Sequence, residues 1–151
     1  MIRAATMSDS ARVIELLRAS HIGAGFHDGS SGFAFPFVET YAHRLFHQHV
    51  EMMDACAIVH DVDGDAQGVL LATAYEHRFG PVWIASETVW WIDPAHRGRS
   101  AFAMLDAYES WARGKRCAYV GMAGMGDDPD VAALYERRGY RRAETHFLKA
   151  V

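Results

Sequence analysis

The sequence predicts one domain of the α/β (α+β) class, in which a mixed sheet is flanked by helices. Half of the 151 residues are apolar, which is enough to bury one core but hardly two. Strand and helix patterns alternate without repeats or linkers, and this order excludes a sandwich and a helical bundle. A strand at 82–92, a helix at 98–114 and a strand at 117–124 predict one parallel β-α-β unit with a right-handed crossover.

The first third of the chain predicts a short strand, two helices and a loop. Residues 2–6 are expected as the strand. Ser8 stands where a helix cap belongs, and the helix is expected to end near Ser20, with an apolar face made of Val13, Ile14, Leu16 and Leu17. Residues 21–37 are rich in glycine and phenylalanine, and their apolar residues follow neither the helical nor the strand period. Such a composition is typical of a binding loop or of a disordered tip. A second helix is expected at 36–52, where apolar residues recur at helical spacing: Phe37, Tyr41, Leu45 and Phe46.

The middle of the chain predicts a hairpin, a long strand and a helix. Strand patterns at 55–60 and 67–77 flank the turn 61–66, which contains an Asp-Gly pair. The apolar run at 82–92 predicts a third strand. The next segment, 98–114, carries an apolar stripe at helical spacing, made of Ala101, Met104, Leu105, Tyr108, Trp111 and Ala112.

The last third predicts a strand, a short helix and a closing strand. The strand is expected at 117–124. Asp128 at the cap, Pro129 at the first helical position and Gly139 just past the end delimit the helix. Residues 145–151 are expected as the closing strand.

Composition argues against a membrane protein, a secreted protein and a metal site. No apolar run approaches the roughly 20 uncharged residues of a membrane span, and the N-terminus lacks the apolar core of a secretory signal. We therefore expect a cytoplasmic protein. Cys56 and Cys117 lie in predicted strands without CxxC spacing, which indicates buried reduced thiols. His43 and His47 have helical i, i+4 spacing, but the sequence places no third ligand, so we interpret them as part of a solvated helix face.

The net charge of −4 hides an asymmetry along the chain. Residues 1–95 contain five basic and twelve acidic side chains, whereas residues 96–151 contain ten basic and seven acidic ones. The excess of basic over acidic side chains in residues 96–151 is too small for a nucleic-acid-binding protein. It suits one polyanionic small ligand, and it equally suits an ordinary solvated surface.

The turn between the strand at 82–92 and the helix at 98–114 has the chemistry of an anion site. The first N–H groups of a helix lack internal partners and carry the positive end of its dipole, so residues 98–102 can cradle an anion. Arg97 and Arg99 add full charges, while Asp93 and Pro94 end the strand. A merely solvated helix start is the alternative interpretation.

The sequence resembles the GNAT superfamily of acyl-CoA-dependent N-acetyltransferases. The order of the elements agrees over essentially the whole chain, 1–151, and two segments carry the most specific resemblance. WWIDPAHRGRSAFAML looks like the family's strand, Pro-x-x-Arg-Gly turn and helix, and DVAALYERRGY looks like its Leu-Tyr-Glu-x-x-Gly-aromatic segment. ASETVWWIDPAHRGR is further similar to a compact subgroup with members in phage genomes. The resemblance implies a GNAT-like, mostly antiparallel sheet of about six or seven strands with about four helices, whose β-α-β unit binds the coenzyme.

The implied co-substrate is acetyl-CoA. Its pyrophosphate would lie on the N–H groups of 98–102, and its pantetheine arm would pair with the backbone of Trp90 and Ile92 like an added strand. The expected coenzyme-binding residues are Trp90, Trp91, Ile92, Arg97, Gly98, Arg99, Ser100, Ala101 and Phe102. Two of them depart from the family's small residues. Ser100 can donate a further hydrogen bond, whereas Phe102 either turns into the core or crowds the phosphates.

The implied reaction needs a base for the amine and an acid for the departing thiolate. Tyr135 matches the family's tyrosine and is the expected acid, with plain packing as the alternative. Glu87 is the only carboxylate inside its apolar strand and is the expected base. The alternatives are an ion pair with Arg78 or Arg3, and a water acting as the base. Strand alternation places Glu87 on the side of Trp91 unless a bulge shifts the register.

We therefore expect an N-acetyltransferase that moves an acetyl group from acetyl-CoA to a primary amine of a small molecule or protein. The amine would enter between the loop at 21–37 and the acidic strand region. The alternative is a CoA-binding or regulatory module without transferase activity. No nucleic-acid or membrane partner is expected, and a homodimer is possible. Asp128 is interpreted as a structural cap, and the basic cluster is interpreted as surface charge, made of Arg137, Arg138, Arg141 and Arg142.

Overall fold

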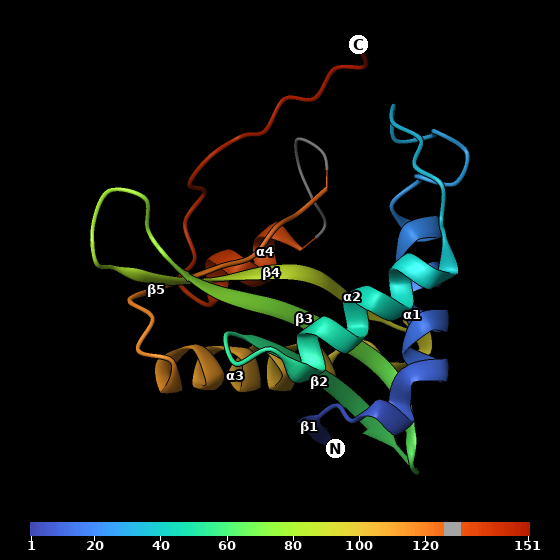
Figure 1. Ribbon diagram of the computed structural model, residues 1–151, viewed down its shortest axis with the longest axis horizontal. Helices are drawn as coiled ribbons and strands as arrows, with labels where there is room; N and C mark the ends of the chain where they lie inside the picture. The colour runs from blue at the N-terminus through green and yellow to red at the C-terminus, as the bar shows by residue number, and fades with distance from the viewer. Residues whose placement is uncertain (126–130) are drawn as a thin grey trace. The chain divides into compact units, whose positions relative to one another are not determined.

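The computed structural model describes residues 1–125 and 131–151, which form two compact units, Met1–Gly121 and Met122–Val151 (Figure 1). The first unit contains five strands and three helices in the order β1 (Ile2–Ala4), α1 (Ser10–Gly23), α2 (Glu39–Glu51), β2 (Ala55–Val62), β3 (Asp65–Glu76), β4 (Trp83–Ile92), α3 (Arg99–Gly114) and β5 (Tyr119–Gly121). The second unit contains α4 (Ala132–Arg137). Asp128 and Pro129, expected at the start of that helix, lie outside the described residues.

The strands of the first unit form one sheet in the order β1-β2-β3-β4-β5. The pairs from β1 to β4 are antiparallel, and β5 pairs parallel to β4. This confirms the mixed α+β class and the parallel β4-α3-β5 unit. The hairpin turn between β2 and β3 is formed by Asp63 and Gly64, both with positive φ (54° and 95°). A two-residue hairpin of type I′ requires positive φ at both turn residues, and an Asp-Gly pair adopts this backbone readily.

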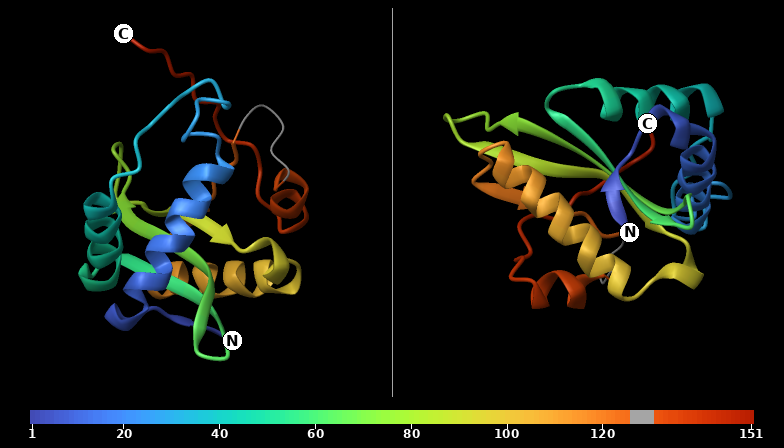
Figure 2. Two further views of the ribbon diagram at one scale, coloured as in Figure 1. Left: turned by 90° about the vertical axis from the view of Figure 1, so that its right-hand side faces the viewer. Right: turned by 90° about the horizontal axis from the view of Figure 1, so that it is seen from below.

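Helices cover both faces of the sheet within the first unit. Figure 2 shows α1 and α2 on one face and α3 on the other, in agreement with the contacts that these helices make with the strands. Val69 and Leu71 of β3 belong to the core beneath α1 and α2. Leu70, between them, points to the opposite face because side chains alternate along a strand. Among the described residues, none of the helices has both the length and the apolar character needed to cross a bilayer.

The entry into α1 differs from the prediction. A 3-10 turn at Met7–Asp9 precedes the helix, so Ser8 is not its cap. Instead, the N–H of Thr6 donates to the Asp9 carboxylate at 2.8 Å, and the Arg3 guanidinium donates to the same carboxylate at 2.8 Å. The contact with Arg3 holds the pKa of Asp9 down at about 2. The sequence pattern did not reveal this cap because Arg3 belongs to β1.

The second unit confirms one prediction and contradicts another. Gly139 has a φ of 88° just past the end of α4, as the stop signal predicts. Residues 145–151 form no strand, and Phe147 is 93% exposed. The expected closing strand is therefore wrong, and the described residues form five strands rather than six or seven. Alternating side chains suggest a strand, but a strand also needs a partner for its N–H and C=O groups.

Candidate functional site

The turn that leads from β4 to α3 is anchored by Arg12 of α1. The Arg12 guanidinium lies 2.5 Å from the Asp93 carboxylate, and its Nε donates to the Ala66 carbonyl at 3.0 Å. The indole N–H of Trp91 also reaches the Asp93 carboxylate, at 3.4 Å. Asp93 thus does more than end the strand, because it ties the turn to α1 and to β3.

Trp91 is the packing centre of this region. A Cβ added to Gly23 would lie 2.6 Å from the Trp91 ring, so only glycine lets the end of α1 approach this closely. The Arg97 guanidinium lies 4.8 Å from the centre of the Trp91 ring, and its Nε donates to the Ile92 carbonyl at 2.9 Å. Arg97 is therefore folded back on β4, where it places a positive charge beside the strand end.

Helix α3 begins with backbone that only glycine adopts easily. Gly98 has a φ of 106° and a ψ of −117°, and the N–H of Ala101 already bonds back to its carbonyl at 3.1 Å. The Ser100 hydroxyl donates to the His96 carbonyl at 2.5 Å. The sequence left two orientations open for Phe102, into the core or toward the phosphates. Its side chain is 40% exposed, which excludes the core orientation. With Arg99 exposed beside it, the first turn of α3 presents N–H groups and positive charge to an anion.

The edge of β4 that faces away from β3 suits an added extended chain. The parallel ladder to β5 covers only Ile84–Ser86 of β4. The N–H of Asp93 bonds the Gln67 carbonyl on β3 at 2.9 Å. Because hydrogen-bonding positions alternate in an antiparallel pair, Trp90 and Ile92 direct their backbone groups away from β3. The Ile92 carbonyl is the one that accepts from Arg97.

A β-bulge in β4 corrects the expected orientation of Glu87. Val89 pairs with Leu71 and Glu87 pairs with Ala72, which leaves Thr88 as the extra residue. Since directly opposed residues share a face, Glu87 lies on the α3 face with Trp90. Plain alternation would have placed it with Trp91. Among its proposed ion-pair partners, Arg3 is excluded, because Arg3 bonds Asp9 and Asp61 at the β1 end of the sheet.

His49 of α2 is a polar residue that the sequence did not single out. It is 5% exposed, and its Nδ1 lies 2.8 Å from the Leu45 carbonyl. A carbonyl only accepts, so Nδ1 carries the proton, and Nε2 accepts from the Thr88 hydroxyl at 3.0 Å. Burial lowers the pKa of His49, which keeps the ring neutral. The pair fixes the bulge and leaves the lone pairs of the Thr88 oxygen open to a donor.

His43 makes a polar contact, and the two cysteines are not paired with each other in the described residues. His43 lies 3.1 Å from the Ser10 hydroxyl, and no group of three potential metal ligands occurs in the described part of the chain. Cys56 and Cys117 are free thiols. Burial raises the pKa of Cys56 to about 12, so this thiol stays protonated and unreactive.

Tyr135, the expected acid, belongs to the second unit. It is buried in α4, its hydroxyl donates to the Ala123 carbonyl at 3.0 Å, and its ring centre lies 5.7 Å from that of Tyr140.

A cavity of about 420 Å³ lies under the loop between α1 and α2. Its walls come from the end of α1, the loop and one side of α2, and Val89 of β4 also lines it. The loop at 21–37 that the sequence predicts is therefore ordered and encloses space, although α1 extends into it as far as Gly23.

Comparisons with known proteins agree with this arrangement. Several solved structures share the fold over nearly the whole chain. A transcriptional regulator from Bacillus halodurans C-125 has 18% identity and a TM-score of 0.78, with 100% of this chain and 99% of that chain covered. An aminoglycoside antibiotic 6'-N-acetyltransferase from Acinetobacter haemolyticus has 18% identity and a TM-score of 0.73, with the same coverage. A predicted acetyltransferase from Clostridium acetobutylicum, solved with acetyl-CoA, has 13% identity and a TM-score of 0.77, with 99% and 95% covered.

Comparison of the sequence with family models identifies the family. A search of curated proteins finds no match. The model of the acetyltransferase (GNAT) family matches residues 24–140, which include most of the loop, the bulged strand, the turn from β4 to α3, and Tyr135. The chain therefore belongs to the GNAT family of acetyltransferases, whose shared reaction is acetyl transfer from acetyl-CoA.

Proposed function

We propose that this protein transfers an acetyl group from acetyl-CoA to the primary amine of a small molecule or protein by direct attack of the amine on the thioester. The observation that carries the proposal is the joint between β4 and α3. There, backbone groups of Trp90 and Ile92 face away from β3, and a helix start with positive charge follows directly. An extended arm that ends in a pyrophosphate matches both features.

The coenzyme contacts follow from this joint. Of the N–H groups of residues 98–102, that of Ala101 is already bonded to the Gly98 carbonyl, so the N–H groups of residues 98–100 would bind the pyrophosphate, with Arg99 as the exposed counter-charge. Arg97 contributes charge from its place on Trp91. Since Ser100 donates its proton to His96, its backbone N–H, rather than its hydroxyl, is the group offered to a phosphate. Phe102 is 40% exposed, so its ring borders the proposed phosphate position rather than the core.

The chemistry assigns one role to each remaining residue. The lone pair of the amine forms the new C–N bond as the C–S bond breaks, and the amine must be deprotonated, by Glu87 or by a water that it orients. An outward N–H of β4 stabilises the charge that develops on the carbonyl oxygen. Tyr135, once its hydroxyl turns away from the Ala123 carbonyl that it bonds, gives a proton to the departing thiolate. The roles of Glu87 and Tyr135 are supported by the strand's single carboxylate and by the family's Leu-Tyr-Glu segment.

Thermal melting tests the coenzyme part of the proposal. Acetyl-CoA and desulfo-CoA at 100 times their dissociation constants should each add about 2.7 kcal/mol of stability. Thiol release from acetyl-CoA across a panel of amines then tests the transfer itself. No melting shift with either ligand would contradict the proposal at its first step.

A second candidate is a module that binds CoA without transferring the acetyl group. The bond from Arg97 to the Ile92 carbonyl favours it, because an added strand would have to displace or share that bond. Binding of acetyl-CoA with no thiol release for any amine would support this candidate over the transferase.

A further inference from the structure

The cavity between α1, α2 and their connecting loop has a largely apolar lining that includes the charged side chain of Arg44. Its volume of about 420 Å³ falls in the range of small-ligand pockets. Val89 brings β4 into the lining, and the following residue, Trp90, is one whose backbone faces the proposed coenzyme arm. A ligand in this cavity can therefore place one end against the reacting strand.

The walls are largely aromatic, and contacts within the loop support them. The His21 ring lies edge-on to Phe37 and to Phe26, with centres 5.4 Å and 5.9 Å apart. The N–H of Phe35 closes the loop on the Phe26 carbonyl at 3.0 Å. Gly25 has a φ of 71°, and a Cβ there would lie 2.6 Å from the Ser30 hydroxyl oxygen. These contacts tie the loop to the end of α1 and to itself.

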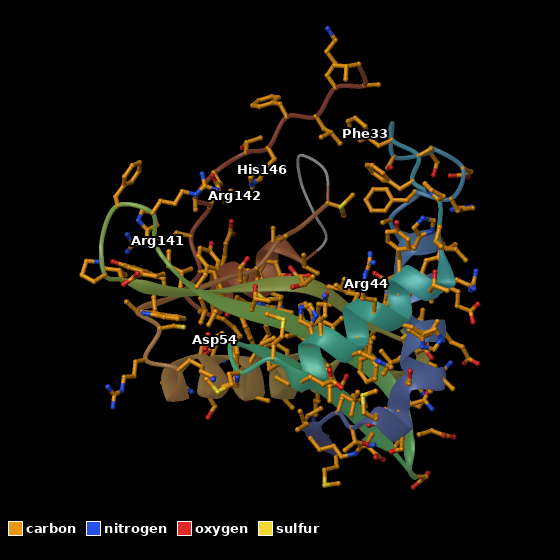
Figure 3. The ribbon with its side chains drawn as sticks, in the orientation of Figure 1. Phe33, Arg44, Asp54, Arg141, Arg142 and His146 are labelled. Atoms are coloured by element: carbon orange, nitrogen blue, oxygen red, sulfur yellow. The ribbon has the colours of Figure 1, made fainter. Side chains whose placement is uncertain are left out.

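Arg44 sets the charge of the cavity. Its guanidinium lies 4.3 Å from the centre of the Tyr41 ring, and Figure 3 shows the side chain projecting from α2. Across residues 1–125 and 131–151, Arg44 makes no ion pair, and the cavity lining includes neither aspartate nor glutamate. The cavity therefore offers a positive charge that is free to pair with an anionic group of a ligand.

This lining disfavours substrates with several positive charges. Both the apolar walls and the charge of Arg44 raise the free energy of an ammonium group more than that of a neutral amine. A polyamine or an aminoglycoside would bury charge here without a counter-ion. A single amine on an aromatic body, by contrast, gains from the walls and loses its proton more easily, as the transfer reaction requires.

We propose that this cavity binds the acyl acceptor, and that the acceptor is a small aromatic amine with a carboxylate, about the size of an aromatic amino acid. The ring packs against Phe26, Phe37 and Tyr41, the carboxylate pairs with Arg44, and the amine points toward β4 at Val89. Val89 lies on the α1–α2 face of the sheet and Glu87 on the other face, so Glu87 acts on this amine through a water rather than directly. The inference rests on the proposed acetyltransferase function and names its substrate class.

The first test compares three amines in the thiol-release assay with saturating acetyl-CoA. We expect kcat/KM for L-phenylalanine to exceed that for phenylethylamine, which lacks the carboxylate, and that for spermidine by at least tenfold. Spermidine as the best substrate would overturn the proposal.

Two variants assign the recognition to named residues. Arg44→Gln should lower kcat/KM at least tenfold for L-phenylalanine, mainly through KM, and less than twofold for phenylethylamine. Ser20→Phe, which adds bulk at the cavity wall, should lower both values and leave the melting shift with acetyl-CoA intact. Arg113→Gln, on the opposite face of the sheet, is the control and should change neither. Equal losses for both amines in Arg44→Gln would overturn the role of the carboxylate.

A binding measurement separates this inference from the proposed reaction. Calorimetry with N-acetyl-L-phenylalanine needs no turnover. Binding to the wild-type protein that is lost in Arg44→Gln, without thiol release for any amine, would support the cavity assignment and contradict the transferase. Thiol release with spermidine alone would support the transferase and contradict the cavity assignment. No binding of N-acetyl-L-phenylalanine together with no turnover of L-phenylalanine would overturn the assignment.

Discussion

Nε2 of His49 accepts a hydrogen bond from the Thr88 hydroxyl at 3.0 Å, which joins α2 to the one residue of β4 that the bulge leaves unpaired with β3. Thirty-nine residues separate the two side chains in the sequence. The contact holds the strand distortion in place at the centre of the candidate site.

Stability should fall on acidification because His49 is buried. Its folded-state pKa is lowered by desolvation, so below about 6.5, the ordinary value, the unfolded chain binds the proton more readily than the folded one. The free energy of unfolding should therefore decrease as pH falls through 6.5 toward the folded-state pKa. Urea unfolding at pH 7.5 and 5.5 measures this.

His49→Gln identifies the source of that pH dependence. The variant should lose less stability between the two pH values than the wild type. Part of the dependence should remain, because burial also lowers the pKa of His60. An unchanged difference between pH 7.5 and 5.5 would exclude His49 as the responsible group.

Removing Arg12 should damage the coenzyme turn. Arg12→Met leaves the half-buried Asp93 carboxylate without its ionic partner, which should cost about 1–3 kcal/mol of unfolding free energy and weaken acetyl-CoA binding. Arg18→Met on the same helix removes an exposed pair with Glu39 and should change stability by less than about 0.5 kcal/mol. Denaturant titration and calorimetry with acetyl-CoA compare the two. Equal effects would show that the turn does not depend on Arg12.

Gly98→Ala should be destabilising for a conformational reason. A Cβ at Gly98 meets nothing within 4 Å, but its φ of 106° is strained for other residues, at a cost of about 1–3 kcal/mol. Gly114→Ala, at the end of the same helix and equally open, should be neutral or stabilising by up to about 1 kcal/mol. Melting of both variants, with and without acetyl-CoA, measures the difference. A neutral Gly98→Ala with full acetyl-CoA affinity would show that α3 starts correctly without glycine.

Tyr135→Phe should lower kcat by about 10²–10⁴-fold, the usual contribution of a general acid, and should leave acetyl-CoA affinity within about twofold, a change of roughly 0.4 kcal/mol. The loss of the bond to Ala123 should cost about 1 kcal/mol of stability. Tyr140→Phe, its ring neighbour, serves as the control and should retain kcat. An unchanged rate in Tyr135→Phe would remove the residue from the mechanism.

Glu87→Gln should lower kcat at neutral pH, and the rate of the variant should recover as pH rises. At higher pH a larger fraction of the substrate amine is already deprotonated, so the loss of the enzyme's base matters less. The pH–rate profile of the variant against the wild type is the measurement. Parallel profiles would assign Glu87 a packing role and leave water as the base.

Local signals predict most of the elements. The Asp63-Gly64 turn, the stop at Gly139 and the start of α3 at Gly98 each depend on backbone preferences of one or two residues, so they can be read without a partner. The apolar stripes of α1 and α3 are visible for the same reason, since helical periodicity is a property of one segment.

The rest was decided by residues distant in the sequence. The bulge at Thr88, its bond to His49 and the anchoring of Asp93 by Arg12 depend on which strands and helices become neighbours. The same holds for the closing strand that residues 145–151 do not form. Sequence by itself determined the helix start, the charged turn and the family. Tertiary structure alone decided the face of Glu87 and the cavity that Arg44 lines, because register and enclosure are properties of paired elements rather than of any one segment.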